Sequence, residues 1–93
     1  MANPDVLALL EFALKLTAEE AINECRLRGA VIVSERELAG RPGSRHWHLR
    51  IPGQPGTLEL NEWQGRVWAK IHPRRQGSWV VGLANELARQ ARP

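Results

Sequence analysis

Several residue types are scarce in this 93-residue sequence, and each scarcity excludes something. A single cysteine, Cys25, means that no disulfide can form within the chain, which favours the reducing cytoplasm. Cys25 falls in a helical pattern with no histidine near it in sequence, so we interpret it as a small buried side chain. The longest apolar run covers only residues 6–10, far short of a membrane span, and we therefore expect no membrane partner.

The chain also lacks the motifs that specify a reaction. We find no Ser/His/Asp pattern, no glycine-rich phosphate loop and no pair of acids suited to general acid–base catalysis. Thirteen Lys and Arg against ten Asp and Glu give a net charge of +3, which suits an anionic partner and equally an ordinary surface. We therefore expect a small binding module, a single domain over residues 1–93, with no assigned catalytic residue and no cofactor.

Alternation of apolar and polar residues with period two predicts an antiparallel sheet over residues 30–72. A β-branched run and three alternating runs supply the strands, at residues 30–33, 45–51, 57–63 and 66–72. Gln64 and Gly65 form a two-residue hairpin turn, which fixes the register of the last two strands. That register pairs Trp63 with Arg66, Asn61 with Trp68, Glu59 with Lys70, Leu60 with Ala69 and Leu58 with Ile71.

The register between the second and third strands depends on a longer connection, residues 52–56. Trp47, Leu49 and Ile51 must share the buried face, and the simplest pairing that achieves this places Ile51 opposite Leu58. The opposite face, the outer face, then carries three rows of side chains across the sheet. These rows are Arg50-Glu59-Lys70, His48-Asn61-Trp68 and His46-Trp63-Arg66.

Residues 5–28 are expected to be helical. Asn3, Pro4 and Asp5 form a typical helix start, and residues 6–16 contain only two polar side chains. A helix that is apolar nearly all round must be covered on more than one side, either by the rest of the domain or by a second copy. We favour a homodimer, formed through Val6, Leu9, Leu10 and Ala13.

Two further helix signals complete the chain. A capping box at Thr17 predicts a helix that ends at Arg28, and one bent helix or two helices over residues 5–28 both stay open. Apolar residues at helical spacing predict a C-terminal helix over residues 78–91, with Ser78 as its N-cap. The expected fold class is α+β: a two-layer domain whose antiparallel meander of three to four strands carries the N-terminal helices and the C-terminal helix on one face.

The outer face and the basic turn before the last helix are the candidate binding site. Single-stranded nucleic acid is bound by aromatic rings that stack on bases and by cations that follow the backbone. A helix start beside two arginines also favours a phosphate. The same residues are compatible with a structural charge ladder or a protein interface. With RNA or DNA as partner, the candidate residues are His46, His48, Arg50, Arg66, Trp68, Lys70, Arg74, Arg75 and Ser78.

The three histidines raise the question of a metal site. His46 and His48 lie on one face of one strand, but strand geometry places His72 on the order of 20 Å from His46. Two histidines without a third ligand make a poor site, so we expect no metal. General acid–base chemistry by either histidine stays open, because imidazole titrates near neutral pH.

One strand resembles a known family. The order helix, three strands, helix resembles the double-stranded-RNA-binding fold. One strand is also similar to that of HicA-type toxins, which are small ribonucleases of toxin and antitoxin pairs. The similar residues are Gly43-Ser44-Arg45-His46, Trp47-His48-Leu49-Arg50 and Pro52-Gly53. In that family a histidine directly after Gly-Ser is catalytic. Here Arg45 holds that position and His46 comes one residue later, on the other face of the strand. The resemblance implies RNA cleavage by His46.

Three functions follow from the sequence. The first is nucleic-acid binding through the outer face and the basic turn. The second is a protein-interaction or homodimerisation module with no nucleic-acid role. The third is a HicA-like ribonuclease toxin that uses His46.

Overall fold

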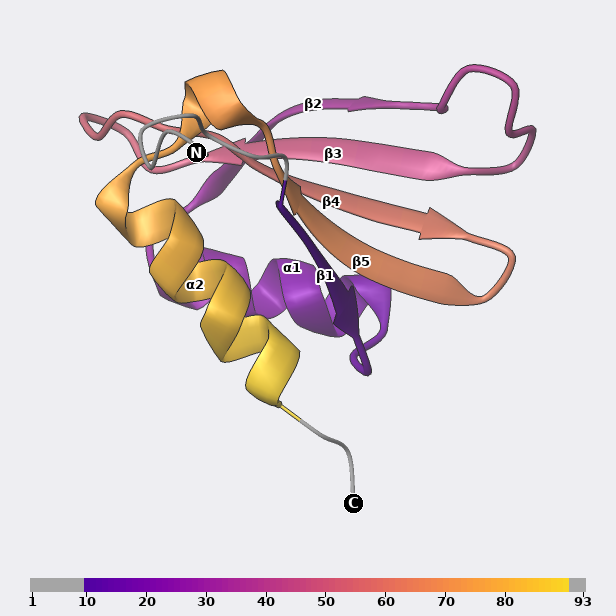
Figure 1. Ribbon diagram of the computed structural model, residues 1–93, viewed down its shortest axis with the longest axis horizontal. Coiled ribbons are helices and arrows are strands. Elements are labelled where there is room, and N and C mark those ends of the chain that lie inside the picture. The colour runs from indigo at the N-terminus through magenta and orange to yellow at the C-terminus, as the bar shows by residue number, and fades with distance from the viewer. Residues whose placement is uncertain (1–9, 91–93) are drawn as a thin grey trace, which may run out of the picture.

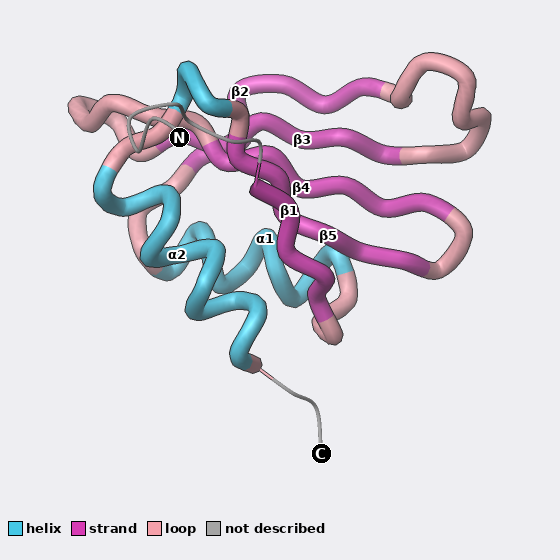
Figure 2. Tube along the Cα trace, viewed as in Figure 1, coloured by secondary structure: helices cyan, strands magenta, loops and turns pink. Residues whose placement is uncertain are grey.

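The computed structural model describes residues 10–90 as an α+β domain in which a five-stranded antiparallel sheet carries two helices on one face (Figure 1). The strand order across the sheet is β1-β5-β4-β3-β2. Figure 2 shows both helices on the same side of the sheet, which makes two layers. In chain order the elements are β1 (Leu10–Leu14), α1 (Ala18–Leu27), β2 (Val31–Arg36), β3 (Arg45–Arg50), β4 (Leu58–Trp63), β5 (Arg66–Ile71), the 3-10 turn η1 (Pro73–Arg75) and α2 (Ser78–Arg89).

The first expected helix is wrong, because residues 10–14 form strand β1. This strand pairs antiparallel with β5, with Leu10 opposite Ile71 and Leu14 opposite Val67. Leu10, Phe12 and Leu14 thereby join the core, whereas Glu11 and Ala13 point to the opposite face. Pairing along β5 gives the inward-facing backbone groups of β1 partners and turns every second side chain toward the core.

Because residues 10–14 form a strand, the apolar helix from which a homodimer interface was expected is not present there. Leu10 and Ala13 belong to a strand at one end of the sheet, and Val6 and Leu9 lie outside the described residues. Within residues 10–90, no helix is long and apolar enough to cross a membrane.

The helix after β1 follows its capping signal. The Thr17 hydroxyl accepts from the Glu20 amide at 3.1 Å, and the Glu20 carboxylate accepts from the Thr17 amide at 2.9 Å. Gly29 follows the helix with a φ of +90°, a left-handed conformation that glycine adopts without strain. The predicted capping box and stop signal are confirmed, and residues 5–28 form a strand and one helix over the described part.

The register of β4 and β5 is confirmed at four of the five predicted pairs, from Glu59 opposite Lys70 to Trp63 opposite Arg66. Both turn residues, Gln64 and Gly65, have positive φ, as a tight two-residue hairpin requires.

The register of β3 and β4 differs from expectation by two residues. Leu49, not Ile51, lies opposite Leu58, and Glu59 therefore lies opposite His48. A shift of two keeps each side chain on its expected face, because side chains alternate with period two. The three expected rows are nevertheless wrong as written, since every outer residue of β3 meets a different partner on β4.

The core lies between the inner face of the sheet and the two helices. Strand β2 pairs antiparallel with β3, as expected, and extends to Arg36. Helix α2 starts at Ser78, but the cap position is Gly77 and no side chain caps it, so the expected Ser78 N-cap is wrong. The fully buried large side chains from the sheet and helices include Trp47, Leu49, Leu58, Leu60, Ile71, Val80 and Leu87.

Candidate functional site on the outer face

The outer face of the sheet, opposite the helices, carries polar side chains that lie in two rows. The row through His46 continues to Asn61 and Trp68, and the row through His48 continues to Glu59 and Lys70. His46, Glu59 and Asn61 are buried, with exposed fractions of 8%, 6% and 1%. Burial of polar and charged groups on a sheet face that helices do not cover is uncommon and requires an explanation.

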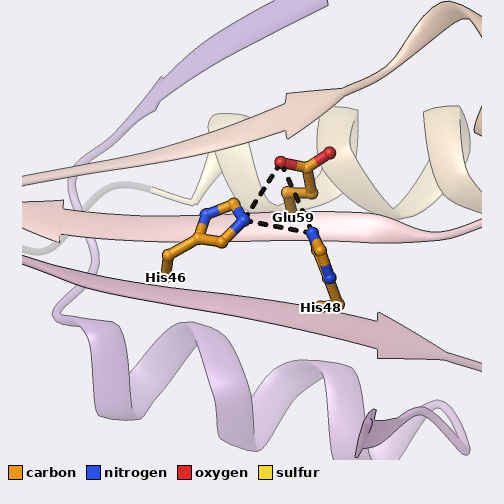
Figure 3. Close-up of side chains that lie close together, drawn as sticks. All are labelled: His46, His48 and Glu59. Carbon is orange, nitrogen blue, oxygen red and sulfur yellow. Dashed lines mark hydrogen bonds and ion pairs between the residues drawn. The ribbon is translucent and has the colours of Figure 1, made fainter. Parts of the chain in front are cut away.

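Three side chains of this face converge on one point and form what we call the His–Glu cluster: His46, His48 and Glu59 (Figure 3). The two Nε2 atoms of the histidines are 3.0 Å apart. Glu59 Oε1 lies 3.4 Å from His46 Nε2 and 3.8 Å from His48 Nε2. Two strands position the cluster, because the histidines are two residues apart on β3 and Glu59 faces them from β4.

The far nitrogen of each imidazole is held by a neutral side chain. His46 Nδ1 donates to Asn61 Oδ1 at 2.5 Å, because an amide oxygen can only accept. His48 Nδ1 and the Ser34 hydroxyl, on β2, are hydrogen-bonded at 3.0 Å. With the proton of neutral His46 on Nδ1, its Nε2 presents a lone pair to the centre of the cluster.

The charge state of His48 follows from its surroundings. Burial lowers the pKa of His48 below its ordinary value, Glu59 opposes the shift, and the charges of Arg75, Arg36 and of His46 when it is protonated lower the pKa further. The neutral imidazole, which is a base and a potential metal ligand, is therefore favoured near neutral pH.

A basic hollow adjoins the cluster on the outer face. It has a volume of about 440 Å³, and among residues 10–90 no acidic side chain lines it. His48 belongs both to the cluster and to the wall of the hollow, so the two features touch. The lining residues are Val33, His48, Arg50, Gly56, Thr57, Arg74 and Arg75.

The loop before β4 and the start of α2 hold the basic turn in place. The Thr57 amide donates to the Arg75 carbonyl at 2.9 Å, and Trp79 Nε1 donates to the Pro55 carbonyl at 2.7 Å. His72 caps the turn, because its Nδ1 accepts from the Arg74 amide at 3.3 Å. His72 is thus occupied elsewhere and does not join the His–Glu cluster.

A second hollow, the aromatic hollow, lies near the β4–β5 hairpin and has a volume of about 430 Å³. The guanidinium of Arg41, from the β2–β3 loop, lies 5.1 Å from the ring centre of Trp63 and 5.9 Å from that of Trp68. Trp63 Nε1 also donates to the Pro42 carbonyl at 3.2 Å. The residues that line this hollow are Glu11, Ala13, Arg41, Trp63, Gln64, Arg66, Val67 and Trp68.

The nine residues singled out from the sequence are thus distributed over several places. His48, Arg50, Arg74 and Arg75 meet in the basic hollow. Arg66 and Trp68 line the aromatic hollow, and Arg41 already occupies one side of the Trp68 ring. His46 is buried in the cluster, Lys70 pairs with Glu59 across the strands, and Ser78 is exposed at the first residue of α2.

The sequence did not predict four residues that contribute to the site: Ser34, Arg41, Glu59 and Asn61. Glu59 and Asn61 were placed on the outer face but beside the wrong partners, because the register was off by two. A register with Leu49 opposite Leu58 would have identified Glu59 as the third member of the cluster.

Comparison of the chain with protein-family models, with curated proteins and with solved structures finds no match.

Proposed function

We propose that this chain binds single-stranded nucleic acid across the outer face of its sheet, with the phosphate backbone in the basic hollow. The observation that carries the proposal is the convergence of Arg50, Arg74 and Arg75 with His48 on one hollow, where the described part of the chain contributes no acidic side chain. These arginines come from two separate segments, so their meeting is a product of the fold. Like charges that are brought together in this way favour an anionic ligand.

Arginine suits a phosphate ligand in particular. Its planar guanidinium donates two parallel hydrogen bonds to phosphate oxygens, and it remains charged at every relevant pH. Arg50, Arg74 and Arg75 are all exposed, so a ligand reaches them without a change in the fold.

The aromatic hollow supplies the second requirement, a surface for bases. It lies toward the opposite end of β4 from Thr57, about 20 Å away at the rise of a β-strand. In the proposed complex, the nucleic acid spans both hollows, with phosphates in the basic hollow and bases near Trp68. Bases stack on guanidinium planes as well as on rings, so Arg41 over Trp63 and Trp68 extends the stacking surface.

The test is fluorescence anisotropy of a labelled single-stranded RNA of mixed sequence, and of the DNA of the same sequence, titrated with protein at low and raised salt. The proposal predicts saturable binding that weakens steeply as salt increases, because phosphate contacts release counterions. Double-stranded RNA of the same length is the control ligand and is expected to bind more weakly, because its bases are not open to stacking. Absence of binding to either single strand at low salt contradicts the proposal.

A protein-interaction or homodimerisation role is the second candidate, and the sheet edges favour it. β1 and β2 are the outermost strands of the described sheet, and Val31 and Val33 on β2 are 44% and 53% exposed. Open edges pair readily with further strands. Sedimentation at increasing protein concentration measures the oligomeric state of the parent and of Val33→Lys. A dimer that persists in Val33→Lys counts against pairing through β2.

The HicA-like ribonuclease hypothesis makes a different prediction at His46. Cleavage needs His46 to reach an RNA 2′-hydroxyl or the leaving oxygen, and the position of the His–Glu cluster beside the basic hollow supports this role for a bound RNA. The labelled single-stranded RNA from the anisotropy experiment is incubated with the protein and then run on a denaturing gel. The gel distinguishes cleavage of the RNA from binding alone. Intact RNA with retained binding removes the ribonuclease hypothesis and leaves nucleic-acid binding standing.

A further inference from the structure

We infer that His46, His48 and Glu59 bind a divalent transition-metal ion of the zinc class. The three candidate ligand atoms, one from each side chain, are separated by 3.0, 3.4 and 3.8 Å. Ligands that surround zinc tetrahedrally at about 2.1 Å are about 3.4 Å from one another. The observed triangle therefore has the size of one face of such a tetrahedron, and Figure 3 shows the three groups directed at its centre.

The donor set matches this class of ion. Two imidazole nitrogens with one carboxylate oxygen are the protein ligands of many catalytic zinc sites and of non-haem iron sites. Magnesium and calcium prefer sites made only of oxygen atoms, so they are expected to bind poorly. The sequence interpretation rejected a metal because it found no third ligand near His46 and His48, and Glu59 is that ligand.

The contacts around the cluster resemble the outer shell of a metal site. A histidine that ligates a metal usually donates its other ring nitrogen to a carbonyl, a carboxylate or a hydroxyl, which fixes the tautomer and the ring orientation. Asn61 Oδ1 accepts from His46 Nδ1 in this way, and Ser34 Oγ lies 3.0 Å from His48 Nδ1. Both Nε2 atoms are thereby directed inward.

The position of Glu59 is difficult to explain by ion pairing alone. Its side chain is 8% exposed, yet its distances of 3.4 and 3.8 Å to the histidine nitrogens exceed those of charge-assisted hydrogen bonds, about 2.8 Å. A buried carboxylate without a close partner is costly. A dication at the centre of the triangle would provide that partner, and the two Nε2 atoms would ligate it in place of the 3.0 Å contact between them.

The ion would also lie beside the basic hollow, because His48 contributes to both. Three protein ligands leave a coordination position that catalytic zinc sites keep for water or substrate. The two proposals can fail separately, because the phosphate contacts are assigned to Arg50, Arg74 and Arg75 and the zinc titration contains no nucleic acid.

The experiment is a titration of the metal-free full chain with ZnCl₂ in competition with a chromogenic chelator, without nucleic acid. The expected result is one equivalent of Zn²⁺ bound, unaffected by an excess of Mg²⁺. Glu59→Gln and His48→Gln keep the size of the side chains and are expected to weaken Zn²⁺ binding more than about a hundredfold, whereas Ser34→Ala weakens it about tenfold. His72→Gln, a histidine outside the cluster, is the matched control and is expected to bind as the parent does.

Zn²⁺ binding that Glu59→Gln and His48→Gln leave unchanged, or no binding of one equivalent by the parent, overturns the proposal. Because a variant of a buried residue can fail to fold, a second measurement uses the unmodified chain. Side-chain ¹⁵N chemical shifts recorded during the titration are expected to move at Nε2 of His46 and His48 and to stay unchanged at His72. A shift confined to His72, or none at all, contradicts the assignment.

Discussion

Gly77 lies so close to Pro55 that a Cβ atom on Gly77 would be 2.3 Å from the Pro55 carbonyl oxygen. This approach joins the start of α2 to the loop before β4, two residues after the turn that carries Arg74 and Arg75. The same contact region includes the hydrogen bonds of Thr57 to Arg75 and of Trp79 to Pro55. The geometry of the basic hollow therefore depends on the absence of a side chain at position 77.

The first prediction is that Gly77→Ala destabilises the protein by about 1–3 kcal/mol, because the methyl group must displace backbone atoms. It should also weaken nucleic-acid binding, since Arg74 and Arg75 move with the turn. The matched control is Gly82→Ala in the middle of α2, where a Cβ meets nothing within 4 Å. That variant is expected to be about 0.5–1 kcal/mol more stable, because alanine favours the helix. Urea unfolding of both variants measures the difference, and equal effects contradict the close approach.

The second prediction concerns Cys25, which is fully buried and has its pKa raised to about 12. Burial is the largest cause, the charge of Glu24 adds to it, and Arg28 opposes it. At pH 8 only about one thiol in ten thousand is then ionised. Reaction with a thiol-specific reagent should be very slow in the native protein and fast in denaturant. Complete reaction in native buffer within seconds contradicts the burial of Cys25.

The same shift makes stability depend on alkaline pH. The thiol has a folded pKa above the ordinary value of 9.0, so its contribution is fully present below pH 9. Between pH 9 and about 12 the unfolded state loses the proton first, and this contribution falls by about 1.4 kcal/mol per pH unit. The difference in unfolding free energy between the parent and Cys25→Ala should decrease over that range. A difference that is constant with pH contradicts the raised pKa.

The third prediction concerns Arg41, whose guanidinium lies over Trp63 and Trp68. Arg41→Ala should cost about 0.5–1 kcal/mol of stability and make the two rings more accessible. Quenching of tryptophan fluorescence by acrylamide, a neutral quencher, measures that accessibility. Arg26→Ala removes an exposed arginine from α1 and is the control, for which quenching should not change. Equal quenching in both variants contradicts the contact.

The fourth prediction separates a ligand-binding role of Glu59 from a purely structural one. In metal-free protein, Glu59→Gln should raise the unfolding free energy by about 0.5–2 kcal/mol, because it removes a buried charge with no close partner. Chemical unfolding in the presence of a chelator measures the change. A structural ion pair with protonated histidine predicts the opposite, a loss of about 3–5 kcal/mol.

Much of the fold was predictable because its signals are local. The Thr17 capping box, the Gln64-Gly65 hairpin and the apolar stripe of α2 each depend on residues a few positions apart, and each is observed. Strand β1 was missed because residues 10–14 carry Ala13, a small apolar residue, on the outer face, which hides the alternation. The feature that decides the conformation of these residues is the edge of β5, more than 50 residues away in the sequence.

The candidate site was predictable only in part, for a related reason. Alternation placed His46, His48 and Glu59 on one face but did not say which residues lie opposite one another. The seven-residue connection between β3 and β4, residues 51–57, allows registers that differ by two, and all of them bury Trp47 and Leu49. The choice between them converts a charge ladder into a cluster of three potential ligands, and it depends on how the strands and helices pack together.

The central claim is that phosphates bind in the basic hollow, and the dependence of affinity on salt tests it most directly. Phosphate contacts by Arg50, Arg74 and Arg75 predict a slope of about −2 in a plot of log affinity for single-stranded RNA against log salt concentration. The Arg74→Ala, Arg75→Ala double variant should reduce that slope to about −0.7. Arg26→Ala with Arg89→Ala removes the same charge from the helices and should leave the slope near −2. Equal slopes for the two double variants would contradict the placement of phosphates in the basic hollow.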